Sequence, residues 1–389
     1  MKDILKDSIN RVEKWVEGNN YLGYEPFDGL TTPMHVLTFG NLFLERLLMQ
    51  LVRQSPVNLR PLLGIKPLPS TKGRGYMAWG YLSMYKITGD STYADRVREN
   101  LAWLMEHKSP KFEEYSWANH FDFVSRGGRY DKHESIIVWT SSIGQAFLDA
   151  YDLFGDEQHL EVARSICNWI MKLPRHETGT GTCIGYLMGG ESVVHNSNML
   201  GAAMLARTAA MTGESRFKEL AREGMVFSCN RQLPDGAWWY GDHPKYHWID
   251  NFHTGYNLDS LRCYIQYSGD EEFVPNMDSG LEYYRANFFN KDGVPRYYHN
   301  RTYPIDIQCA SQAITTLSLF AGDYPWCLDL AQKVALWTVN HMQVPNGYFI
   351  YRIYPWGRAN IPMLHWGQAT MYKGLVALLE KISTEEGDY

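Results

Sequence analysis

One stretch of the sequence concentrates side chains that can transfer protons. Residues 238–257 read WWYGDHPKYHWIDNFHTGYN. Asp250 and His253 are three positions apart, so both side chains reach the same end of a helix that begins near His253. Asp250 is therefore a candidate general acid or base, His253 a candidate catalytic or ligand-contacting group, and Trp248 and Tyr246 candidate sugar-binding residues. The alternatives are structural, because Asp is a favoured helix N-cap and both aromatic side chains can fill a core.

The histidines of this stretch do not form a pattern typical of metal sites. His243 and His247 are four residues apart, but Pro244 disfavours the helix that would place both rings on one face. No HExxH motif or paired carboxylate–histidine set accompanies them. We expect neither a metal ion nor another cofactor.

Hydrolysis of a glycosidic bond needs a second carboxyl group, since one protonates the leaving oxygen while the other activates water or attacks. Glu134, in YDKHESIIVW, and Asp306, in RTYPIDIQ, are the two candidates. Each precedes a predicted helix, so helix capping is the alternative role for both.

Candidate substrate-binding residues stand in the same kind of segment, just before or at the start of a predicted helix. Tryptophan and tyrosine stack on sugar rings, and amides and imidazoles form hydrogen bonds with hydroxyl groups. Arginine binds a carboxylate with two parallel hydrogen bonds. The set comprises His133, His195, Asn198, Trp248, Tyr246, Tyr303, Arg74, Arg301, Arg358 and Trp366. The arginines indicate a ligand that carries a uronic acid, although arginines on surface loops are also common.

A recurring short turn shows which elements must position these residues. The segments ITGDSTY, LFGDEQH, MTGESRF, YSGDEEF and FAGDYPW contain Gly89, Gly155, Gly213, Gly269 and Gly322. In each turn, glycine in the left-handed conformation is expected to end one helix, and the following acidic residue to cap the next. The helix after each turn is amphipathic, whereas the helix before it is small and apolar almost all round. The pattern predicts a repeat of helical hairpins with inner and outer helices.

The repeat predicts an all-α fold, an (α/α)6 toroid that forms a single domain over residues 1–389. The inner helices are expected at about 72–87, 137–153, 194–211, 253–267, 307–320 and 364–381. The outer helices are expected at 4–18 and from about 92, 157, 215, 272 and 326. A further helix near 40–53 and the proline-rich segment 55–70 form an insertion at about 38–70 in the first hairpin. We expect this insertion on the rim or at a subunit contact.

The topology also predicts where the ligand binds. The inner helices of such a ring run parallel, so their N-terminal ends and the long preceding loops meet at one mouth. Those loops hold the candidate residues above, whereas the loops at the other end are short turns. The aromatic content of the chain is 14%, and many of these residues stand in the loops at the mouth. This predicts a carbohydrate-binding groove there.

Composition excludes several other functions. The net charge is −6 with both signs interspersed, and no basic stripe of the kind that binds nucleic acid occurs. The sequence shows neither a signal peptide nor an apolar run long enough to span a membrane. Six cysteines without a CxxC pair indicate reduced thiols, so we expect a cytoplasmic protein. A homo-oligomer remains open beside the monomer.

The hairpins, the GD-containing turns and the segment RQLPDGAWWYGD (231–242) together resemble the six-hairpin glycosidase superfamily. Within it, WIDNFHTGYNLDSL (248–261) is similar to a motif of proteins labelled as polysaccharide-biosynthesis proteins, whose relatives include uronate-processing hydrolases and, more distantly, glucuronyl C5-epimerases. The resemblance implies a toroid over nearly the whole chain and a carbohydrate substrate. One toroid hosts many reactions, so the reaction itself is not implied.

Three functions follow, and we favour the first. A glycoside hydrolase acting on uronate-containing oligo- or polysaccharides would use Asp250 with Glu134 or Asp306. A uronate C5-epimerase or lyase would instead remove the proton next to the carboxylate, with His253, Tyr246, Tyr256 or Tyr303 as proton-transfer groups. A non-catalytic glycan-binding toroid would need only the aromatic residues.

Overall fold

Two concentric layers of helices form the structure, a computed structural model that describes residues 1–125, 127–190 and 192–387. In these residues the inner layer consists of α3 (Thr71–Thr88), α5 (Ile137–Phe154), α7 (His195–Thr212), α9 (Asn251–Ser268), α11 (Ile307–Phe320) and α13 (Thr370–Glu386). The outer layer consists of α1 (Lys2–Gly18), α4 (Ser91–Glu106), α6 (Glu157–Met171), α8 (Ser215–Cys229), α10 (Val274–Asn287) and α12 (Pro325–Met342).

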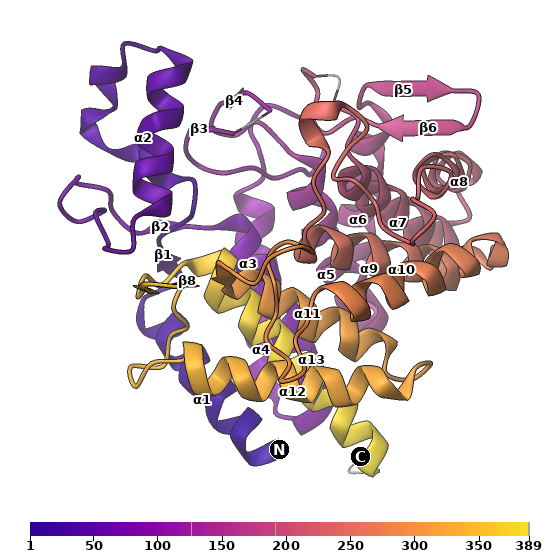
Figure 1. The fold of residues 1–389 in the computed structure, drawn as a ribbon. Coiled ribbons are helices and arrows are strands. Elements are labelled where there is room, and N and C mark those ends of the chain that lie inside the picture. The colour runs from indigo at the N-terminus through magenta and orange to yellow at the C-terminus, as the bar shows by residue number, and fades with distance from the viewer. Residues whose placement is uncertain (126, 191, 388–389) are drawn as a thin grey trace.

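The inner helices close into a ring. Each packs against the next one along the chain, and α13 packs against α3. Every outer helix after α1 packs against the inner helix that precedes it, and α1 covers α13. The fold is therefore an all-α (α/α)6 toroid, and the predicted helix positions are confirmed to within a few residues (Figure 1).

The glycine turns join inner to outer helices largely as predicted. Four of the five glycines cap an inner helix in the left-handed conformation, with φ between +66° and +74°: Gly89, Gly155, Gly213 and Gly269. Gly322 does not, because α11 ends at Phe320 and its C-cap residue, Ala321, has a right-handed conformation. The fifth turn therefore differs from the prediction.

Asp90 and Asp156 cap the outer helices α4 and α6, whereas Asp270 caps a 3₁₀ helix, η4 (Glu271–Phe273), that precedes α10. Asp90, Asp156 and Asp270 each accept a hydrogen bond from the backbone N–H two residues on, at 2.9, 3.0 and 3.2 Å. Glu214 occupies the N-cap position of α8, but its side chain accepts no capping hydrogen bond, and α12 begins after Tyr324 rather than at Asp323.

All described strands lie in the long connections from outer to inner helices. They form short antiparallel pairs: β1 (Leu22–Gly23) with β2 (Leu68–Pro69), β3 (Phe123–Val124) with β4 (Arg129–Tyr130), and β5 (Arg175–Thr178) with β6 (Gly181–Ile184). A three-stranded sheet has the order β7 (Ile305–Asp306), β8 (Arg352–Tyr354), β9 (Gly357–Ala359). These pairings give the loops at the mouth a fixed shape.

The connection between α1 and α3 carries the insertion. It contains two 3₁₀ helices, η1 (Asp28–Thr31) and η2 (Pro33–Thr38), and the helix α2 (Leu42–Gln54), which stands apart from the ring at the upper left of Figure 1. A buried ion pair anchors it, because Arg60 Nε donates to both carboxylate oxygens of Asp28 at 2.9 and 2.8 Å. Arg60 Nη2 also donates to the Glu25 carbonyl at 2.9 Å.

The inner helices form the core. In α5 every residue from Ile137 to Leu148 is buried, as expected for a helix covered on all sides. The sixth inner helix departs from the prediction: a π-helical turn at Leu364–Ala369 precedes α13, which continues to Glu386. None of the described helices combines the length and apolarity needed to cross a bilayer.

Ring closure depends on a close approach of α3 and α13, which gives a first prediction. A Cβ atom added at Gly80 would lie 2.5 Å from two ring carbons of the buried Tyr372. We expect Gly80→Ala to lower the free energy of unfolding by about 1–3 kcal/mol through overpacking. Gly18→Ala, where nothing lies within 4 Å, is the control and should be neutral or slightly stabilising. Chemical denaturation compares the two, and equal stabilities would contradict the closure argument.

Candidate functional site

A cavity of about 890 Å³ opens at the mouth of the ring, a volume suited to a ligand of several rings. The inner-helix N-terminal ends, the loops before them and α2 all contribute to its walls. Its aromatic lining comprises Phe27, Phe123, Tyr130, Trp139, Tyr186, Tyr240, Tyr246, Trp248, Phe252, Tyr256, Tyr297, Tyr298 and Trp366.

The charge of the cavity is strongly positive. Its described lining includes the cationic residues Arg46, Arg53, Lys72, Lys245, Arg301 and Arg352, and a single acidic residue, Asp250. Arg352 is neutralised, since its Nε donates to Asp306 Oδ2 at 2.5 Å. Among the described residues, no carboxylate lies within ion-pair distance of the other five cations, so the cavity favours an anionic ligand.

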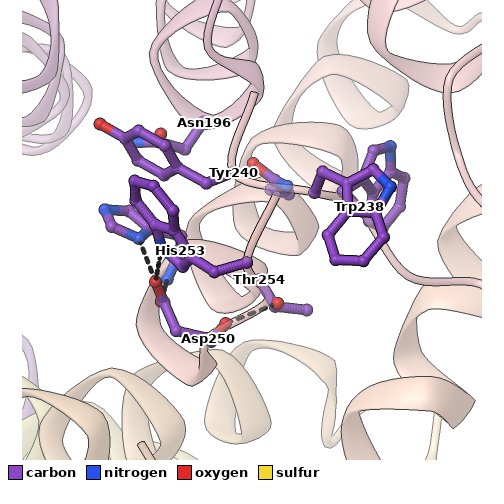
Figure 2. Close-up of a pocket in the computed structure, with 9 residues that line it drawn as sticks. Asn196, Trp238, Tyr240, Asp250, His253 and Thr254 are labelled. Atoms are coloured by element: carbon purple, nitrogen blue, oxygen red, sulfur yellow. Dashed lines mark hydrogen bonds and ion pairs between the residues drawn. The ribbon is translucent and has the colours of Figure 1, made fainter. Parts of the chain in front are cut away.

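Asp250 is held by three donors at the start of α9. Its Oδ1 accepts from the His253 backbone N–H at 3.1 Å, so it caps the helix. Its Oδ2 accepts from Trp248 Nε1 at 2.9 Å and from His253 Nδ1 at 2.7 Å (Figure 2). With a side chain only 1% exposed, this carboxylate fixes the imidazole ring rather than facing the cavity freely.

The consequence for His253 is a defined orientation. Because Nδ1 donates to Asp250, Nε2 carries the lone pair and is the nitrogen available to a ligand. The Tyr240 ring stacks on Trp248 at 4.4 Å and its centroid lies 4.6 Å from that of His253. Asn196, at the start of α7, lines the same pocket, and its buried Oδ1 has no described hydrogen-bond partner (Figure 2).

A second histidine–carboxylate pair lies at the same cavity. His365 belongs to the π-helical turn before α13, a kind of local irregularity frequent at functional sites. Its Nδ1 contacts a carboxylate oxygen of Glu25, and its backbone N–H donates to the other Glu25 oxygen at 3.1 Å. Both side chains are at most 4% exposed. This pair resembles Asp250 and His253 on another wall, but its Nδ1–carboxylate contact is an ion-pair contact without hydrogen-bond geometry.

Buried tyrosines of the cavity are kept protonated. Burial raises the pKa of Tyr240 well above its usual value, and burial together with Tyr76 does the same for Tyr256. Tyr256 OH accepts from Gln308 Nε2 at 2.8 Å and lies 3.4 Å from Tyr76 OH. Although burial acts in the opposite direction, Lys72 and Lys373 hold the pKa of Tyr76 below its usual value. The hydroxyl groups of Tyr240 and Tyr256 are therefore neutral and can donate hydrogen bonds.

The structure brings six of the sequence-predicted site residues together around the cavity: Asp250, His253, Tyr246, Trp248, Arg301 and Trp366. Trp366 is oriented by a hydrogen bond from its Nε1 to Asp306 Oδ1 at 2.8 Å, and the Arg301 guanidinium lies over the Tyr298 ring at 4.3 Å.

Three predicted residues lie within the walls instead. Asp306 is 0% exposed, caps α11 and pairs with Arg352. His195 Nε2 lies 3.1 Å from Asp242 Oδ1, and its Nδ1 3.2 Å from Ser228 Oγ. Asn198 bridges three partners, including the backbone of Ile184 and Gly224. Their polar atoms form hydrogen bonds or ion pairs within the protein, so these three residues stabilise the walls of the cavity.

Five predicted residues lie outside the described cavity lining. Glu134 pairs with Lys111 at 2.7 Å at the surface, and His133 packs beside His120 with ring centroids 5.5 Å apart. Arg74 bonds Asn100 at 3.0 Å and stacks on Tyr21.

The other two of these five are exposed. Tyr303 is 41% exposed, and Arg358 bonds the His341 carbonyl at 3.3 Å on the surface.

Sequence reasoning missed several cavity residues. The sequence shows Tyr240 only as part of the segment RQLPDGAWWYGD and gives it no role of its own. His365 and Glu25 are far apart in the chain, so no local pattern predicts that they form a pair. The α2 residues of the cavity could have been recognised from the sequence. At helical spacing they form one polar face, which consists of Arg46, Gln50, Arg53 and Gln54. The insertion therefore forms a wall of the cavity.

No protein-family model and no curated protein matches this sequence. Solved structures do match the fold. A GH76 α-mannanase from Bacteroides thetaiotaomicron superposes with a TM-score of 0.64 at 12% identity, over 81% of this chain and 87% of that one. A cellobiose 2-epimerase from Bacillus thermoamylovorans gives 0.60 at 9% identity, over 79% and 87%. A polysaccharide lyase gives 0.62 at 11% identity, over 99% and 98%.

These neighbours share the toroid of the six-hairpin glycosidase-like superfamily that the sequence resembles. At such identities the likeness establishes the fold alone, and the closer resemblance to uronate-processing proteins stays a prediction.

The placement of Asp306 and Glu134 predicts different effects of substitution. Asp306→Asn leaves the buried Arg352 without its counter-charge, so we expect it to lower the free energy of unfolding by about 3–5 kcal/mol. Glu134→Gln removes a surface ion pair and should change stability by about 0.5 kcal/mol or less. Denaturant titration of both variants measures this. An Asp306→Asn protein as stable as wild type would argue against the structural role.

Proposed function

We propose that this protein is a carbohydrate-processing enzyme that removes the proton next to the carboxylate of a uronic acid residue, as a uronate lyase or C5-epimerase does. The observation that carries the proposal is the Asp250–His253 pair. It presents one oriented imidazole nitrogen to a cavity that is rich in cations and holds no second described acid.

The walls of the cavity support the substrate class. Aromatic rings such as Trp248, Tyr246 and Trp366 suit the apolar faces of sugar rings. Arg53 and Arg301 suit carboxylates, since a guanidinium binds a carboxylate with two parallel hydrogen bonds. The three structural neighbours are named as an α-mannanase, a cellobiose 2-epimerase and a polysaccharide lyase, all of which act on carbohydrates.

The first chemical step uses His253 as the base. Its Nε2 takes the C5 proton, the C5–H bond breaks, and the electron pair delocalises into the substrate carboxylate. Asp250 stabilises the imidazolium that forms and keeps its orientation. A cation of the cavity stabilises the additional negative charge that develops on the carboxylate group in the transition state.

The second step distinguishes the two reactions. In a lyase the C4–O bond breaks and the leaving oxygen takes a proton, for which Tyr240, whose ring lies beside that of His253, is the candidate donor. In an epimerase C5 takes a proton on its other face, for which His365, oriented by Glu25, is the candidate. Both reactions share the base and the anion-binding cavity.

Hydrolysis is less well supported by the geometry. It requires a second carboxyl group at the reacting bond, and the candidates Glu134 and Asp306 lie at the surface and within the wall. Asp250 itself has its oxygens occupied by three donors.

Turnover in heavy water tests the proposed reaction. Uronate-containing glycans are incubated with the enzyme and followed by NMR for deuterium at C5 and for a 4,5-unsaturated uronate. We expect one of these signals, and we expect His253→Ala to reduce the rate by about 10²–10⁴-fold. Glu134→Gln is the control and should retain activity. New reducing ends that carry solvent oxygen, formed equally well by His253→Ala, would contradict the proposal and favour hydrolysis.

Ligand charge gives an independent prediction. Glucuronate or a short uronate oligosaccharide should raise the unfolding temperature more than the matching neutral sugar, because only native-state binding stabilises the fold. Arg53→Gln should reduce this difference, while Arg358→Gln, outside the cavity lining, should leave it unchanged. Thermal unfolding with both ligands measures the effect. Equal shifts for charged and neutral sugars in the wild type would remove the anionic-substrate argument.

A further inference from the structure

The insertion before α3 exposes an unusual amount of apolar surface. Among the large hydrophobic residues of the described chain that are exposed, most lie in this one segment. They are Met34, Val36, Leu37, Phe39, Leu42, Phe43, Leu44, Leu47, Leu51, Val57 and Leu62, with exposed fractions from 38% to 87%. We call these residues the apolar face.

No charge interrupts this face. Between Pro33 and Ile65 no aspartate, glutamate, lysine or arginine is exposed. Arg46 and Arg53 line the cavity, while Glu45 and Arg60 are buried in ion pairs with Arg129 and Asp28. In a chain with 21% charged residues, an exposed stretch of this length without charge is typical of the centre of a protein interface, where charged residues are depleted.

Helix α2 shows that the exposure is patterned. Phe43, Leu47 and Leu51 are spaced by four residues and project outward, whereas Met49 and Val52 are buried. The remaining side of the helix carries the polar residues that line the cavity. An amphipathic helix normally packs its single apolar stripe against the protein core. Helix α2 has one apolar stripe that packs against the protein and a second one that is exposed to solvent.

The size of the apolar face matches a stable interface. Its eleven side chains expose on the order of 1,000 Å², against about 800 Å² that each partner buries in a standard interface. The largest apolar patch of an ordinary monomer is about 300–600 Å². A partner that covers the apolar face would therefore bury enough surface for a stable dimer.

We propose that a second copy of this chain covers the apolar face in a two-fold symmetric dimer. An uncharged apolar surface is complementary to itself, which is the requirement of a two-fold interface. A membrane surface is the less suitable occupant, because apolar faces that bind bilayers are flanked by lysine and arginine. Here Lys66, at the end of the segment, is the one exposed cation from Pro33 to Lys66, since Arg46 and Arg53 are partly buried on the cavity side of α2 and Arg60 is buried, and the chain has a net charge of −6.

The dimer has a consequence for the cavity. Because α2 carries the apolar face on one side and Arg46, Gln50 and Arg53 on another, a partner that packs on α2 fixes one wall of the site. Loss of the partner should then weaken binding of an anionic sugar. This consequence rests on the proposed function, whereas the dimer itself does not.

Sedimentation velocity over a range of concentrations, without any ligand, tests the dimer. The wild type should sediment with the mass of two chains. The double variant Phe43→Glu/Leu47→Lys should be a monomer with unchanged helical circular dichroism, since a Glu–Lys pair four residues apart suits an exposed helix. Leu319→Lys replaces a residue that is 41% exposed outside the apolar face; this control should remain a dimer.

Two results would overturn the proposal. A wild type that is monomeric at every concentration excludes the second copy, and co-sedimentation of that monomer with neutral phosphatidylcholine vesicles would assign the face to a membrane. A double variant that folds and still dimerises would place the interface elsewhere. Failure of the uronate experiments leaves both readouts unchanged, so the two proposals fail separately.

Discussion

Closure of the inner ring is the constraint on which the structure depends. When α13 packs against α3, with the Tyr372 ring against Gly80, six inner helices must run parallel in the described chain. The short glycine turns then occupy one end of the ring, and every long connection emerges at the other. The positive ends of six helix dipoles face that mouth. The placement of the long loops and the location of the cavity follow from this closure.

Within this frame, buried ion pairs decide which charges remain available. Asp306 neutralises Arg352 and Asp28 neutralises Arg60, so these residues hold β7 to β8 and anchor the insertion. Arg53, by contrast, bonds only the Tyr351 hydroxyl, at 3.4 Å, among its described polar contacts. The cost of leaving such a cation near a low-dielectric wall is offset when an anion binds. Asp250 likewise has both carboxylate oxygens hydrogen-bonded, so its role is to orient the His253 ring.

The hairpin pattern was sufficient to predict the toroid because it depends on local signals: glycine turns, acidic caps and the period of apolar residues. Where the local rule failed, at Gly322 and at the π-helical turn before α13, tertiary packing determined the backbone instead. The site was only partly predictable. Asp250 and His253 share one helix start, so their spacing showed the pair, whereas Glu25 and His365 are joined only by folding.

Asp250 fixes His253 with Nε2 toward the cavity, and the tautomer of this ring is the property that tests the arrangement. The ¹⁵N NMR signals of the two ring nitrogens, assigned by comparison with His253→Gln, distinguish a protonated from an unprotonated nitrogen in the neutral imidazole. The account predicts a proton on Nδ1 and a bare Nε2 in the wild type, a preference that Asp250→Asn should lose. A neutral ring protonated at Nε2 in the wild type would contradict it.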